Sequence, residues 1–74
     1  MKNIWIQGGG ILPNLTKPEL NAIREQLQRE RALISRFTSN ARDAEDPQLR
    51  TLYEQIAARH QSHWNTLCGL LGME

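Results

Sequence analysis

The 74-residue sequence predicts an all-α protein, an antiparallel two-helix hairpin that dimerises into a four-helix bundle. Two stretches carry apolar residues at alternating gaps of three and four, which is the period of a helix with one buried face. Only Glu45 and Asp46 separate these stretches, so the helices must fold back on each other. The apolar face of the second stretch is wider than one neighbouring helix covers, and a second copy of the chain is the simplest cover.

The chain divides into an arm and the hairpin. We expect residues 1–14 to form a flexible arm, because Gly8, Gly9 and Gly10 carry a large ordering entropy, and residues 15–74 to form the hairpin. Cys68 is the only cysteine, which excludes a disulfide within the chain. Domains this small often depend on a bound metal or on self-association for stability, which favours one of these for this chain.

The first helix is expected at about residues 17–44. Thr16 and Glu19 have the spacing of a capping box, and Pro18 lies in the first turn, where its missing N–H costs little. Its inward stripe is interrupted by a single acidic residue, Glu30. The stripe consists of Leu20, Ile23, Leu27, Glu30, Ile34, Phe37, Ala41 and Ala44.

The second helix is expected at about residues 47–71, because Asp46 is a good N-cap and Pro47 fits the first helical position. Its stripe comprises Leu49, Leu52, Ile56, His60, His63, Leu67 and Leu70, with Tyr53, Ala57, Trp64 and Leu71 in a second line beside it. The residues predicted to form the core and the dimer contact are Ile34, Phe37, Leu49, Leu52, Tyr53, Ile56, Trp64 and Leu67.

Glu30, His60 and His63 are polar, although the helical period predicts an apolar residue at each of their positions. An antiparallel pairing of Ala44 with Leu49 places Glu30 level with His63, and His60 lies one turn away on the same face. Glu30, His60 and His63 are therefore candidate ligands of a divalent transition metal such as zinc. The alternative is a Glu–His polar layer that only fixes the register of the helices.

Several motifs of residues 15–71 resemble the spore coat protein F (coat F) family of endospore-forming bacteria. The motifs are Leu15-Thr16-x-x-Glu19, Glu30 with Phe37, Asp46-Pro47-Gln48-Leu49-Arg50-x-Leu52-Tyr53-x-Gln55-Ile56-Ala57, His60-Gln61-x-His63 and Thr66-Leu67. The resemblance implies a ferritin-like hairpin, in which a Glu on the first helix faces a Glu-x-x-His motif on the second.

On that pattern Glu30 matches the first Glu and His63 the motif histidine, but His60 stands at the motif Glu position. A dimer would then offer two Glu and four His, a set that suits zinc, nickel, cobalt or copper better than a di-iron centre. With no nucleophile beside these groups, we expect a protein that is not an enzyme. The favoured function is a spore coat-associated structural or interaction protein, and the alternative is a ferritin-like metal-binding protein.

The expected partners are a second copy of the chain and other spore coat proteins. A net charge of +1 leaves no strong field for nucleic acid, and we interpret the arginines as a solvated helix face. No apolar run approaches the ~20 residues that span a bilayer, and no signal peptide is recognisable. We expect synthesis in the cytoplasm and deposition in the spore coat.

Overall fold

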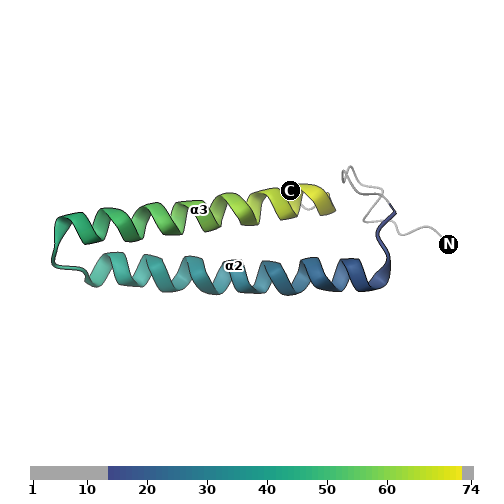
Figure 1. Cartoon of the computed structure of the whole chain (residues 1–74), viewed down its shortest axis with the longest axis horizontal. Helices are drawn as coiled ribbons and strands as arrows, with labels where there is room; N and C mark the ends of the chain where they lie inside the picture. Colours follow the sequence, from purple (N-terminus) through teal and green to yellow (C-terminus); the bar gives the residue numbers. More distant parts are fainter. Residues whose placement is uncertain (1–13, 73–74) are drawn as a thin grey trace.

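The computed structural model describes residues 14–72, and in this range the chain forms two α-helices packed side by side as an antiparallel hairpin (Figure 1). Helix α2 spans Lys17–Asp43 and helix α3 spans Pro47–Leu71, and no strand occurs among the described residues. The predicted all-helical hairpin is confirmed. Of the predicted arm over residues 1–14, all but Asn14 lies outside the described residues.

Side chains at each helix start satisfy backbone N–H groups that have no partner within the helix. The Thr16 hydroxyl accepts a hydrogen bond from the Glu19 N–H, and the Glu19 carboxylate accepts one from the Thr16 N–H at 2.9 Å. The Asp46 carboxylate accepts from the N–H groups of Gln48 and Leu49 at 2.7 and 3.1 Å. Both starts therefore agree with the sequence prediction.

The turn between the helices contains only Ala44, Glu45 and Asp46. Arg50 closes it from the first turn of α3 by donating a hydrogen bond from Nη2 to the Ala44 carbonyl oxygen at 2.8 Å. At the other end of α3, Gly72 adopts a left-handed conformation with φ of 72°, which favours glycine because a side chain there is strained. Local hydrogen bonds are thus present at all four helix ends, including that of the Ala44 N–H to the Ala41 carbonyl oxygen at the end of α2.

The apolar core of the hairpin lies mainly at its open end, where α2 begins and α3 ends. Leu20, Leu27, Cys68 and Leu71 are buried there, and Leu71 is the most buried at 1% exposure. Leu15, Ile23, Trp64 and Leu67 pack against this cluster. Cys68 is buried in this cluster and packs there as a small apolar residue.

Near the turn the buried side chains are small, namely Ala41 and Ala44 of α2. The large apolar side chains at the start of α3 are exposed. Leu49 and Leu52 are 40% and 50% exposed, so the single hairpin does not bury them, and their role as dimer contacts stays a prediction. One neighbouring helix does not cover the full width of the α3 stripe. The other predicted contact residues are half-buried: Ile34, Phe37, Tyr53, Ile56, Trp64 and Leu67.

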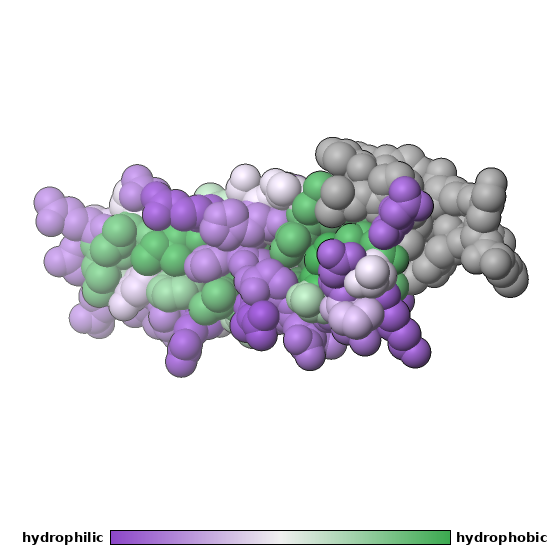
Figure 2. All heavy atoms as spheres, turned by 45° about the vertical axis from the view of Figure 1, so that its right-hand side comes forward, coloured by the Kyte–Doolittle hydropathy of each residue, from purple (hydrophilic) through white to green (hydrophobic). Residues whose placement is uncertain are grey.

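The surface reflects this uneven packing. Figure 2 shows hydrophobic side chains gathered in two areas, one near the turn and one near the open end, with hydrophilic side chains between them. The middle of the hairpin is where Glu30 meets the histidines of α3.

Candidate metal centre

Glu30 of α2 meets His60 and His63 of α3 between the helices. The Glu30 Oε1 atom lies 2.6 Å from Nδ1 of His60 and 3.4 Å from Nδ1 of His63. One potential ligand atom from each of the three residues can be chosen so that all lie within 4.8 Å of one another. Two helices therefore bring three metal-ligating side chains to one point.

The Glu30 carboxylate is buried, and both of its oxygens have hydrogen-bond partners. Its side chain is 6% exposed, and its second oxygen, Oε2, accepts a hydrogen bond from Nε2 of Gln26 at 2.7 Å. The hydrogen bond with His60 lowers the pKa of Glu30 and prevails over burial, which acts to raise it, while Gln26 and His63 lower it further. The carboxylate is consequently held in its charged, ligand-competent form.

Aromatic neighbours orient the His60 ring. The ring stacks on Phe37 with centroids 6.2 Å apart and an interplanar angle of 12°, and its centroid lies 5.5 Å from that of His63, nearly perpendicular to it. The His60 side chain is 21% exposed and that of His63 is 51% exposed. His60 is therefore the fixed member of the pair, and His63 the one that solvent or another chain can reach.

The structure brings together the three residues that the sequence analysis predicted, but the closest pair differs. The helical register placed Glu30 opposite His63, whereas the shorter contact is with His60, one turn away. The contribution of Gln26 was missed. Its position four residues before Glu30 is the signal that could have revealed it, because residues four apart are neighbours on a helix.

The donor set, one carboxylate oxygen and two imidazole nitrogens, is typical of zinc and of other borderline transition metals. In the described geometry, Nδ1 of His60 and the Glu30 carboxylate are joined by a hydrogen bond. A metal ion held by all three groups would replace that hydrogen bond. If the carboxylate instead kept it, Glu30 would orient an imidazole able to ligate through Nε2, a common arrangement around zinc.

Comparisons of the chain with models of protein families, with curated proteins and with solved structures each found no match. The resemblance to the coat F family therefore stays a prediction from the sequence. Within residues 14–72, neither helix contains a stretch apolar enough to cross a membrane.

Proposed function

We propose that this protein binds a divalent transition metal ion, with zinc as the first choice, through Glu30, His60 and His63. The observation that carries the proposal is the convergence of three ligand atoms within 4.8 Å around a buried carboxylate. Burying an acidic side chain is unfavourable unless it is paired, and a cation is one partner that recovers that loss. Three protein ligands also leave one position of a tetrahedral ion for another group.

We further propose that the missing ligand comes from a second copy of the hairpin, in a four-helix bundle. Leu49, Leu52, Ile56 and His63 are spaced by three, four and seven residues, so they follow one side of α3. Both leucines are exposed, and the His63 side chain on the same side is half exposed. A twofold dimer through this side covers the leucines and brings a second Glu–His set near the first.

Thermal melts of the wild type and of His63→Leu, each with chelator and with zinc, test the metal site. Ligation predicts a zinc-dependent rise in the melting temperature of the wild type that is lost in the variant. The rise should shrink at acid pH, because a protonated imidazole cannot ligate a metal ion. Equal curves in all four conditions would leave a polar Glu–His layer as the better explanation.

Sedimentation equilibrium tests the dimer independently of zinc. A homodimer gives about twice the 8.5 kDa mass of the chain, and Leu52→Glu should shift the population towards monomer while helicity remains. Ala58→Glu is the matched control, since it adds the same charge at an exposed position on the other side of α3. A folded wild-type monomer at micromolar concentration contradicts the bundle.

The exposed leucines also favour a second candidate function, that of a structural or interaction protein. On the resemblance described above, its setting is the spore coat and its partners are other coat proteins. Metal analysis of protein purified without added ions separates the candidates, because this function needs no metal at Glu30. The two functions are compatible if the metal stabilises the assembled form.

A further inference from the structure

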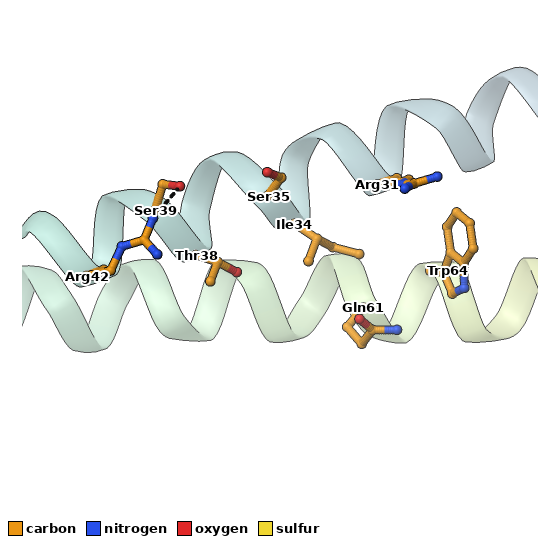
Figure 3. Close-up of a pocket in the computed structure, with 8 residues that line it drawn as sticks. All are labelled: Arg31, Ile34, Ser35, Thr38, Ser39, Arg42, Gln61 and Trp64. Carbon is orange, nitrogen blue, oxygen red and sulfur yellow. Dashed lines mark hydrogen bonds between the residues drawn. The ribbon is translucent and has the colours of Figure 1, made fainter.

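A second feature of the hairpin, separate from the Glu–His cluster, is a groove of about 520 Å³ between α2 and α3. This volume is in the range of sites for small molecules. Figure 3 shows Arg31 and Trp64 at one end of the groove and Arg42 with Ser39 at the other, with Ser35 and Thr38 between them. Neither Glu30 nor either histidine lines this groove.

The lining of the groove is cationic and rich in hydrogen-bond donors. It contains two guanidinium groups, three hydroxyl groups and the Gln61 amide, and no carboxylate. Arg42 donates from Nη2 to the Ser39 hydroxyl at 3.1 Å, which positions the guanidinium at its end of the groove. Within the described residues the guanidinium of Arg31 makes no hydrogen bond or ion pair, so its donors are available.

The two ends of the groove differ in chemistry. The Arg42 end presents the Ser39 and Thr38 hydroxyls beside a positive charge, a donor set that complements the oxygens of a phosphate or carboxylate. The Trp64 end presents a half-buried indole next to Arg31 and the apolar side chain of Ile34. An aromatic ring is a good fit there, since both an indole and a guanidinium stack on ring faces.

The length of the groove limits the ligand. Arg31 and Arg42 are eleven positions apart on α2, which corresponds to about 16 Å along the helix. A single inorganic anion therefore cannot contact both ends. A molecule with an oxyanion at one end and a ring at the other uses the whole lining.

We propose that this groove binds a small organic anion that combines a phosphate or carboxylate group with an aromatic ring. The oxyanion lies against Arg42 and the hydroxyls of Thr38 and Ser39. The ring lies between Trp64 and Arg31. Binding here is independent of the metal proposal, because the two sites share no residue.

Trp64 supplies the signal for a binding experiment. The chain has one other tryptophan, Trp5, so a Trp5→Phe background makes Trp64 the sole indole. The metal-stripped full chain is titrated with 8-phenyloctyl phosphate, 8-phenyloctanoate, inorganic phosphate and neutral 8-phenyloctanol, and its indole fluorescence is followed. In the two anions an alkyl chain separates the ring from the oxyanion, so that one molecule can reach both ends of the groove. Comparison of the two anions distinguishes phosphate from carboxylate as the preferred oxyanion.

The proposal predicts a saturable change with 8-phenyloctyl phosphate or 8-phenyloctanoate, and weaker binding of inorganic phosphate and of 8-phenyloctanol. Arg42→Gln and Arg31→Gln should each weaken binding roughly tenfold, the size expected for one charge-assisted hydrogen bond. Arg36→Gln is the matched control, because Arg36 is an exposed arginine of α2 that does not line the groove. The proposal is overturned if neither aryl anion gives a saturable change, or if Arg36→Gln weakens binding as much as Arg42→Gln.

Discussion

Replacing Glu30 by glutamine should destabilise the hairpin at neutral pH. Glutamine keeps the size of the side chain but removes its charge, and its amide nitrogen can bond to Nδ1 of His60 only when that ring takes the tautomer in which Nδ1 accepts. Hydrogen bonds to a charged carboxylate are thereby exchanged for weaker neutral ones. The expected loss is about 2 kcal/mol of unfolding free energy, which corresponds to roughly 8–16 °C in melting temperature for a domain of this size.

The same substitution should also change how stability depends on pH. The folded Glu30 carboxyl has a pKa below its ordinary value of 4.5, mainly because of the His60 hydrogen bond. Its contribution to stability is therefore complete above about pH 4.5 and is lost as the pH falls through the lower folded pKa. Glu30→Gln should remove this part of the acid-induced loss.

Urea unfolding followed by far-UV circular dichroism, at one protein concentration and a series of pH values, measures both effects. Glu25→Gln is the control, since Glu25 is an exposed carboxylate on the same helix. The pKa of Glu19 is lowered by its hydrogen bonds with Thr16, so wild type and control retain some acid sensitivity from the capping box. If Glu30→Gln matched the wild type at pH 7 and kept the same pH profile, the carboxylate would not stabilise the fold as reasoned here.

Three further outcomes follow from burial and capping. Leu71→Ala should cost ~2–5 kcal/mol because Leu71 is almost fully buried, whereas Leu52→Ala should change the stability of the single hairpin far less; denaturant melts of dilute protein compare them. Thr16→Ala should cost ~1 kcal/mol through loss of the capping box, and Thr66→Ala, at an exposed position in α3, should cost less in the same melts. The Cys68 thiol should react slowly with iodoacetamide in the folded protein and rapidly in urea, as followed by mass spectrometry; equal rates would contradict its burial.

Local chemistry made the helix starts predictable from the sequence. A capping box and an Asp-Pro pair act through hydrogen bonds within a few residues, so no knowledge of the partner helix was needed at Thr16 or Asp46. The meeting of Glu30 with the histidines was also predictable, because a two-residue spacing between the helical stretches leaves little freedom in the register.

The exposure of Leu49 and Leu52 was harder to predict. Periodicity identifies the inward side of a helix, but the separation and crossing of the two helices decide how much of that side is covered. The same limit applies to the groove between Arg31 and Arg42. The groove is lined by residues of both helices, so the sequence of one helix does not reveal it. Considered alone, Arg31 and Arg42 look like part of an ordinary solvated helix face.

The uneven core has a consequence for how the two helices stay together. At the open end, burial of Leu71 and its neighbours holds α2 against α3, whereas at the turn end the short covalent connection does so. A connection of three residues keeps the helix ends close with little entropy to lose on folding. The leucines nearest the turn are thus not required for closing the hairpin and are available for contacts outside it. Cleaving the chain between Ala44 and Asp46 should therefore separate the helices first at that end, where few buried side chains would remain to join them.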